Sequence, residues 1–271
     1  MVVSPVNHQW LFLKYRSTQD TGSSRVTLHE NHALEIPSMP NEITVRTSNS
    51  TRPVLDLLLP EFERVSDLKV TLIPDTAKNS LARIKAGERA DVAVLLGTAV
   101  DELAATGILA TDSKQPFARS NIGIGVLQGA PKPDISTVEA FKRTLLNAKS
   151  IAHTVHGPSG ASFPGLIERL GIAEQVKPKT VTRPGGYIGV VVTAGEAEMA
   201  FQQICELLAV PGIELVGPIP PEIQINFDSK AAIFAESVNQ VAARALLKFL
   251  ARSENAAKFT EAGLEQLEQL K

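Results

Sequence analysis

Hydrophobic and polar positions beyond about residue 41 follow two periods in turn, and this predicts alternating strands and helices. Short apolar or β-branched runs are expected to be strands, and segments of about ten residues with an apolar stripe are expected to be helices. The predicted strands are Ile43–Thr47, Lys69–Ile73, Asp91–Leu95, Ile122–Leu127, Ser150–Thr154, Met199–Gln203, Glu214–Val216 and Phe227–Ala235. The predicted helices are Pro53–Val65, Asn79–Ala86, Val100–Thr106, Val138–Leu146, Phe163–Leu170, Val241–Ala251 and Glu254–Glu261. This order indicates βαβ units, and therefore an α/β protein with mainly parallel sheets.

Two segments share one local pattern, which bears on the number of lobes. KAGERADVAV begins at Lys85 and TAGEAEMAFQ begins at Thr193, and each runs from Ala-Gly-Glu through an acid into a strand. Glycine-ended helices are common by themselves, but the predicted strands also divide near residue 120. We therefore predict two α/β lobes, joined near Arg119–Ile122 and near Val216–Pro220. Lobe I is expected to comprise residues 41–120 and 218–271, and lobe II residues 121–217.

The first forty residues are polar and mixed, without a sustained apolar period. Residues 1–40 are therefore predicted to be an extension without a fixed fold, and Met39 is an alternative start. The short apolar patch Trp10–Leu13 has no basic segment before it and no small-residue cleavage site after it, which predicts no secretory signal. No segment reaches the roughly 20 apolar residues of a membrane span. With a single cysteine, these features predict a cytoplasmic protein without membrane insertion.

Composition excludes several function classes. The chain has 271 residues, 44% of them hydrophobic and 21% charged, with a net charge of −2 and no basic stripe. A nucleic-acid partner is therefore not expected. The five histidines are scattered and Cys205 lies in the apolar run ICELL, so no metal site is predicted. Phosphate-loop, dinucleotide and nucleophile-elbow motifs are absent, and we expect a monomer that needs no cofactor.

Three predicted strand-to-helix junctions are rich in hydroxyl groups and glycine. They read SNSTR at Ser48–Arg52, PDTAKNS at Pro74–Ser80 and HGPSGAS at His156–Ser162. The first N–H groups of a helix lack partners within it, and its dipole adds partial positive charge there. Each serine alone is more simply a helix cap, but three such junctions favour an anion site. The candidate ligand-binding residues are Ser48, Asn49, Ser50, Arg52, Lys78, Ser159, Gly160, Ser162, Tyr187 and Gln202.

The titratable candidates each have a simpler alternative. Arg52 and Lys78 could bind carboxylates, although a charge at such a position usually lies on a solvated helix face. His156 and Tyr187 are the candidate catalytic residues, with His153 nearby. A histidine beside a turn is more often a structural hydrogen-bond partner than a catalyst.

Four stretches of the chain carry a resemblance to a known family. They are SLARIKAGERADVAVL, IGIGVLQGAPKPDISTVEAFKRTLL, GPSGASFPGLIERLGI and GEAEMAFQQICELLAVPGIELVGPIPPEIQ. Over residues 41 to 265 the chain resembles the type 2 periplasmic solute-binding fold, in the branch of molybdate-binding proteins and of relatives described as aconitate isomerases. The resemblance implies two lobes with an anion in the cleft between them. Ser50 matches a serine that contacts the oxyanion in molybdate binders, whereas the second such serine has no counterpart near Thr76 to Lys78.

That departure favours a carboxylate ligand, because Lys78 stands where a molybdate binder has a neutral donor. The leading hypothesis is a small anionic ligand, a di- or tricarboxylate, bound by hinged closure of two lobes. One alternative is an aconitate isomerase, whose proton shift needs a base and an acid from among His156, His153 and Tyr187. A second alternative is molybdate or tungstate binding. The resemblance leaves open whether a transporter is a partner.

Overall fold

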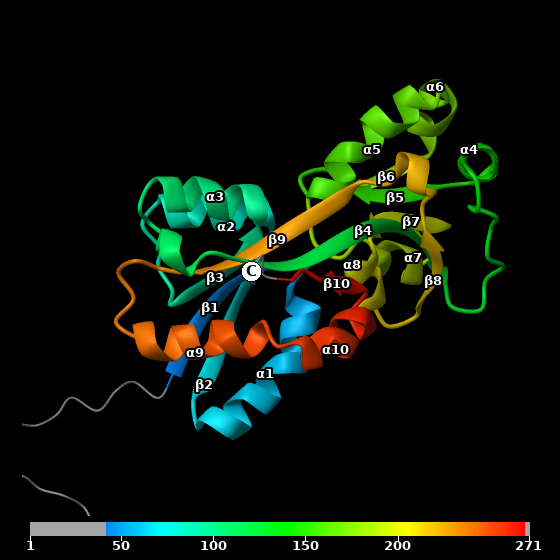
Figure 1. The fold of residues 1–271 in the computed structure, drawn as a ribbon. Helices are drawn as coiled ribbons and strands as arrows, with labels where there is room; N and C mark the ends of the chain where they lie inside the picture. Colours follow the sequence, from blue (N-terminus) through cyan, green and yellow to red (C-terminus); the bar gives the residue numbers. More distant parts are fainter. Residues whose placement is uncertain (1–41, 269–271) are drawn as a thin grey trace, which may run out of the picture. The chain divides into compact units, whose positions relative to one another are not determined.

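The computed structural model describes residues 42–268. The predicted extension over residues 1–40 and the alternative start at Met39 lie outside the described residues. Within the described range, the α/β class is confirmed. Ten strands and ten α-helices alternate along most of the chain (Figure 1).

The strands form one mixed sheet in the order β2-β1-β3-β9-β4-β7-β5-β6, with β8 and β10 also paired to β4. The strands are β1 (Glu42–Ser48), β2 (Lys69–Asp75), β3 (Val92–Leu96), β4 (Gln115–Leu127), β5 (Ile151–Thr154), β6 (Thr180–Arg183), β7 (Met199–Gln203), β8 (Ile213–Pro218), β9 (Asn226–Ile233) and β10 (Leu264–Gln266). The α-helices are α1 (Arg52–Ser66), α2 (Ala77–Lys85), α3 (Gly97–Ala105), α4 (Val138–Asn147), α5 (Pro158–Arg169), α6 (Ala173–Val176), α7 (Gly189–Thr193), α8 (Ile204–Leu208), α9 (Gln240–Leu250) and α10 (Ala256–Glu261).

Strand β4 joins the two ends of this sheet. Its residues 115–121 pair with β9, and its residues 122–127 pair with β7 and β8. Figure 1 shows β4 and β9 crossing the middle of the molecule together. The expectation of two mainly parallel sheets is therefore corrected to a single mixed sheet. The sequence missed the first half of β4 because Pro116, Arg119 and Asn121 interrupt its apolar pattern.

Parallel pairing is found toward the two ends of the sheet. β1 is parallel to β2 and β3, and β5 is parallel to β6 and β7. The strands that pair with β4 run antiparallel to it. In parallel units, helices begin just past the carboxyl ends of the strands. The junctions β1–α1, β2–α2 and β5–α5 therefore belong to this arrangement.

Separate apolar clusters fix the helices on the sheet. Phe62 of α1 packs on Phe249 of α9, with ring centroids 5.4 Å apart, in a cluster that also contains residues of β1, β3 and β9. Phe163 of α5 packs on Phe201 of β7 at 4.7 Å, in a second cluster with α4 and β5. Burial of these large side chains holds α1 and α5 in fixed positions, and with them the first turn of each helix.

Helix α5 begins five residues before the predicted Phe163, at Pro158. Proline is favoured in the first turn of a helix, where its missing N–H removes no internal hydrogen bond. The turn expected from HGPSGAS is therefore in large part the first turn of a helix. Ser159, Gly160 and Ser162 lie within that helix.

Gly160 is the point of closest approach between α5 and the end of β5, which gives a test of the packing. A Cβ atom at Gly160 would lie 1.8 Å from the backbone oxygen of Thr154. Gly160→Ala should lower the free energy of unfolding by about 1–3 kcal/mol, because the backbone must shift. Gly165→Ala is the matched control in the same helix, where an added Cβ meets nothing within 4 Å. It should be neutral or stabilise by up to about 1 kcal/mol in urea unfolding. Equal effects of the two substitutions would contradict the close packing.

Candidate functional site

A pocket lies where the β1–α1, β2–α2 and β5–α5 junctions meet the loop before α7 and the start of α8. Its wall is rich in hydroxyl and amide groups, and we call it the polar pocket. The lining residues are Ser48, Asn49, Ser50, Thr76, Ala77, Leu96, Ser120, Thr154, Gly157, Pro158, Gly185, Gly186, Gln202, Gln203, Glu206, Phe227, Ser229 and Leu264. Of the residues predicted to bind the ligand, Ser48, Asn49, Ser50 and Gln202 line it.

The β1–α1 junction presents linked hydroxyl groups to the polar pocket. The Ser48 Oγ lies 3.1 Å from the Ser50 Oγ and 2.9 Å from the Thr51 Oγ1, and each pair shares a hydrogen bond. Thr51 precedes α1 but makes no side-chain cap, and the first turn of α1 contains no acidic residue. The positive end of the helix dipole is therefore not neutralised by a carboxylate of its own first turn.

The β5–α5 junction contains a buried hydroxyl group without a partner. Thr154 is 2% exposed, it lines the polar pocket, and its Oγ1 makes no hydrogen bond. Gly157 precedes α5 without a side-chain cap, and α5 also has no acid in its first turn. A buried polar group left unpaired costs about 1–3 kcal/mol. An anion in the pocket could relieve this cost by accepting from the Thr154 hydroxyl.

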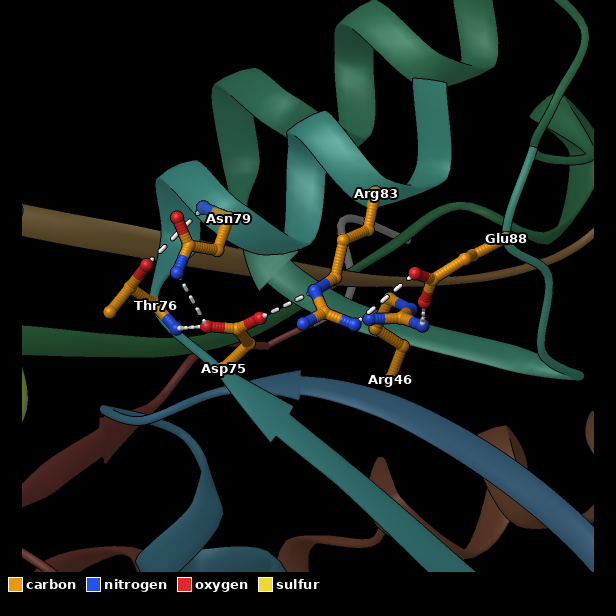
Figure 2. A network of polar contacts seen from close by, with 6 residues as sticks. All are labelled: Arg46, Asp75, Thr76, Asn79, Arg83 and Glu88. Atoms are coloured by element: carbon orange, nitrogen blue, oxygen red, sulfur yellow. Dashed lines mark hydrogen bonds and ion pairs between the residues drawn. The ribbon is translucent and has the colours of Figure 1, made fainter. Parts of the chain in front are cut away.

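The β2–α2 junction is held by a polar network formed by Arg46, Asp75, Thr76, Asn79, Arg83 and Glu88 (Figure 2). The Asp75 carboxylate accepts from the Thr76 N–H at 2.7 Å and from the Asn79 Nδ2 at 3.1 Å. The Thr76 Oγ1 in turn accepts from the Asn79 N–H at 3.2 Å. The first turn of α2 is thereby fixed, and it brings Thr76 and Ala77 to the polar pocket.

Arg83 extends the network along α2. Its Nε lies 3.2 Å from Asp75, and its Nη1 lies 3.2 Å from Glu88, which also pairs with the buried Arg46 (Figure 2). None of these arginines lines the polar pocket. The guanidinium groups therefore support the pocket wall without contributing a charge to its lining.

Gln202 and Tyr187 brace the loop that contains Gly185 and Gly186. The Gln202 Nε2 donates to the Gly186 carbonyl at 2.8 Å, and its Oε1 accepts from the Ile188 N–H at 2.8 Å. The Tyr187 hydroxyl donates to the Asn49 carbonyl at 3.1 Å. Burial raises the pKa of Tyr187 to about 12, so the phenol stays protonated at neutral pH. This bond links the loop to the β1–α1 junction.

Glu206 was not among the sequence candidates, yet among residues 42–268 it is the only ionisable side chain in the lining of the polar pocket. It lies in the first turn of α8 and is 8% exposed. No ion pair to it is found within residues 42–268. Burial raises the pKa of Glu206 to about 8, and a hydrogen bond with Gln202 opposes this shift. The only signal in the sequence was an acid inside the apolar run ICELL.

Several predicted site residues lie elsewhere. Arg52 pairs with Asp56 at 3.3 Å, and both side chains are about half exposed. Ser159 is buried, and its carbonyl accepts from the Ser162 hydroxyl at 2.6 Å. Gly160 packs on the backbone of Thr154. None of these four residues, Arg52, Ser159, Gly160 and Ser162, lines the polar pocket.

His153 also lies away from the polar pocket. Its ring packs 4.9 Å from that of Phe163, and its Nδ1 lies 3.0 Å from the Thr154 carbonyl oxygen. Burial lowers its pKa, so the neutral imidazole is favoured. Its contacts are those of a core residue.

Lys78 and His156 both line an adjoining groove, which we call the side groove. It is lined by Ala77, Lys78, Leu81, Leu96, Thr98, Ala99, Glu102, His156 and Pro158. Ala77, Leu96 and Pro158 line both the side groove and the polar pocket, so the two spaces are neighbours. Glu102, the acid of this groove, pairs with Lys85. Among the described residues, the two basic side chains of the groove, Lys78 and His156, therefore have no acid partner.

Two further predictions concern metals and membranes. Within residues 42–268, no three His, Cys, Asp or Glu side chains are grouped so that they could hold a metal ion. No helix in that range is long and apolar enough to cross a membrane.

Comparison with known proteins supports the predicted resemblance. Residues 43–265 match the family model of the bacterial extracellular solute-binding protein. An aconitate isomerase of Pseudomonas sp. is 36% identical over 231 residues, which cover 82% of this chain and 87% of that protein.

Solved structures share the fold at lower identity. The periplasmic molybdate-binding protein of Azotobacter vinelandii aligns with a TM-score of 0.70 and 16% identity, over 84% of this chain and 100% of the other. The sulfate-binding protein SubI of Mycobacterium tuberculosis aligns with a TM-score of 0.65 and 17% identity, over 83% and 87%. The family matched by residues 43–265 covers most of the chain, and the resemblance expected from sequence is confirmed: the chain belongs to the bacterial extracellular solute-binding protein family.

Proposed function

We propose that this protein binds a small polycarboxylate of the aconitate type in the polar pocket and interconverts its trans and cis forms. The observation that carries the proposal is the buried, unpaired hydroxyl of Thr154, located where the first turns of three helices meet. Such a site is built to accept an oxyanion. The 36% identical aconitate isomerase supports a tricarboxylate as that oxyanion.

The side groove supports a ligand with more than one anionic group. A compact tetrahedral oxyanion would occupy only the polar pocket, to whose lining the described residues contribute no lysine, arginine or histidine. A tricarboxylate with one carboxylate in the polar pocket could reach Lys78 and His156 with another, because the two spaces share Ala77, Leu96 and Pro158. This favours a carboxylate over molybdate.

The predicted two-lobe arrangement is part of the proposal. The change of β4 partners at residues 121–122 coincides with the predicted crossing near Arg119–Ile122. The polar pocket takes Ser50 from the proposed lobe I, and Thr154 and Gln202 from the proposed lobe II. Closure of the lobes on the anion would exclude water from it.

The reaction is a proton shift across an allylic system. A proton leaves the methylene carbon, the double bond moves by one position, and a proton is added at the former vinylic carbon. The product can then have the other geometry about its new double bond. One C–H bond breaks and one forms, so the step needs neither an oxidant nor a second substrate.

Turnover is tested by ¹H NMR of trans-aconitate in deuterated water. We expect cis-aconitate to form at a rate proportional to protein concentration, with the melting temperature raised by either isomer. At 100 times its dissociation constant, a ligand should stabilise the fold by about 2.7 kcal/mol. If trans-aconitate raises the melting temperature but is not converted, the protein is a binding protein and the isomerase proposal is contradicted. Stabilisation by molybdate and by no carboxylate would contradict both.

Thr154→Val tests the orphan hydroxyl, because it should affect stability and binding in opposite directions. The substitution keeps the shape and removes the unpaired group, so the free energy of unfolding without ligand should stay level or rise. Affinity for trans-aconitate should fall by about 1 kcal/mol, measured by calorimetry, through the lost hydrogen bond. Thr182→Val, on the exposed face of β6, is the control and should leave affinity unchanged. Unchanged affinity of Thr154→Val would remove this hydroxyl from the site.

Lys78→Ala tests the reach of the ligand into the side groove. Affinity for trans-aconitate should fall by about 0.2–1 kcal/mol, the range of an exposed ion pair, and the remaining binding should depend less on salt. Lys248→Ala makes the same change in net charge on the exposed face of α9 and should have no effect. Equal losses in the two variants would indicate a general charge effect and contradict the contact.

A further inference from the structure

Glu206 is a buried acid in a pocket proposed to hold an anion. It is 8% exposed and lines the polar pocket together with Ser50 and Thr154. In the part of the chain that the structure describes, no lysine, arginine or histidine lines that pocket. Two negative charges in one desolvated space repel each other, and such a pair favours protonation of one of them. An anionic ligand and a charged Glu206 therefore repel each other, and binding is favoured when one of the two carboxylates is protonated.

The groups that face Glu206 supply no compensating charge. Its titratable neighbours are the Tyr187 phenol and the Cys205 thiol, which are both neutral at pH 7, because burial raises the pKa of each. Gln202 forms a hydrogen bond with the Glu206 side chain but also holds the Gly186 loop. Among the described residues no ion pair involves Glu206. A negative charge on Glu206 is therefore neutralised by a proton and not by a neighbouring cation.

We propose that Glu206 is the acid–base residue of the isomerisation, an inference that rests on the proposed function. In the minor fraction of complexes in which Glu206 is ionised at pH 7, its carboxylate takes the proton from the methylene carbon of trans-aconitate. The electrons of that C–H bond form the new double bond, and those of the old double bond form a C–H bond at the former vinylic carbon. The proton for that bond returns from the Glu206 carboxylic acid. Glu206 ends in the state in which it began, and no net proton is taken up.

The other candidates are less well placed for this step. The Tyr187 hydroxyl already donates to the Asn49 carbonyl, and the phenol is outside the lining of the polar pocket. His156 lines the side groove, where a histidine can bind a carboxylate without meeting the reacting carbons. A carboxyl group whose pKa is raised to about 8 is close to the value that favours general acid–base catalysis at neutral pH.

Glu206→Gln tests the inference, because glutamine copies the neutral carboxylic acid in shape and polarity. We expect turnover of trans-aconitate to fall at least about 100-fold, within the range found for general acid–base groups. The dissociation constant at pH 7 should change less than about threefold, because Glu206 is largely protonated there. Glu174→Gln, an exposed position on α6, is the control and should keep wild-type turnover.

Two pH measurements separate this role from a purely structural one. Wild-type affinity for trans-aconitate should weaken as pH rises from 7 to 9, because ionised Glu206 repels the ligand, and Glu206→Gln should abolish that dependence. The folded pKa of Glu206, about 8, lies above the unfolded value of about 4.3. The contribution of protonated Glu206 to the free energy of unfolding is therefore fully present below about pH 4.3 and is lost as pH rises to about 8. The melting temperature of Glu206→Gln should thus exceed that of the wild type more at pH 8 than at pH 5.

The outcomes distinguish the two proposals. If Glu206→Gln retains more than a tenth of the wild-type turnover rate, the role of Glu206 is overturned and the proposed function stands. Absence of wild-type binding and turnover overturns the proposed function and the role together.

Circular dichroism checks that the variant folds. If Glu206→Gln does not fold, Glu206→Asp keeps the acid and should retain part of the turnover. Turnover by Glu206→Asp equal to the wild type, with an unchanged pH profile, would also overturn the role.

Discussion

The unmet hydrogen-bonding capacity at the starts of helices α1 and α5 is the constraint on which the site depends. Helices α1, α2 and α5 all begin beside the polar pocket, and none has an acidic residue in its first turn. Within α2 the Thr76 side chain provides a cap, but α1 and α5 have none. Their first N–H groups and the Thr154 hydroxyl therefore need acceptors from outside the helices. In the proposed function, an anion in the pocket accepts from these donors with little direct ion pairing.

The rest of the fold keeps these helix ends together. Apolar clusters fix α1 and α5 on the sheet, and the hydrogen bonds of Asp75 with Thr76 and Asn79 fix the first turn of α2. The Tyr187 hydroxyl ties the loop before α7 to the β1–α1 junction. Among the described residues Glu206 has no counter-ion, and burial keeps its pKa raised. The two proposals, anion binding and proton transfer, therefore rest on the same feature, a pocket wall of neutral donors.

Much of the fold follows from the sequence pattern, because apolar periodicity reports burial. Every predicted strand and helix overlaps one in the structure, and Gly87 and Gly195 of the two AGE segments both adopt a positive φ. The short elements β6, α6, α7, α8 and β10 were not predicted, because three to five residues are too few to show a period. The first half of β4 was missed because Pro116 and Arg119 do not resemble a buried strand.

The site was predictable only in part. Ser48, Asn49, Ser50 and Gln202 were inferred from their places at strand ends, and the structure brings them to one pocket. Ser159 and Gly160 were expected to reach the ligand from a loop, but an early helix start turns them into packing residues. Glu206 could not be found, because the direction of a side chain in a five-residue helix depends on tertiary packing. Thr154 read as a buried strand end, and its missing partner is visible only in three dimensions.

The most direct measurement of the central claim is a crystal structure of the protein with trans-aconitate. We expect one ligand carboxylate in the polar pocket, within hydrogen-bonding distance of the Thr154 hydroxyl and of N–H groups in the first turn of α5. The Glu206 carboxyl should face the carbons between which the proton moves. Ligand density that leaves the polar pocket empty, or that places the reacting carbons away from Glu206, would contradict it.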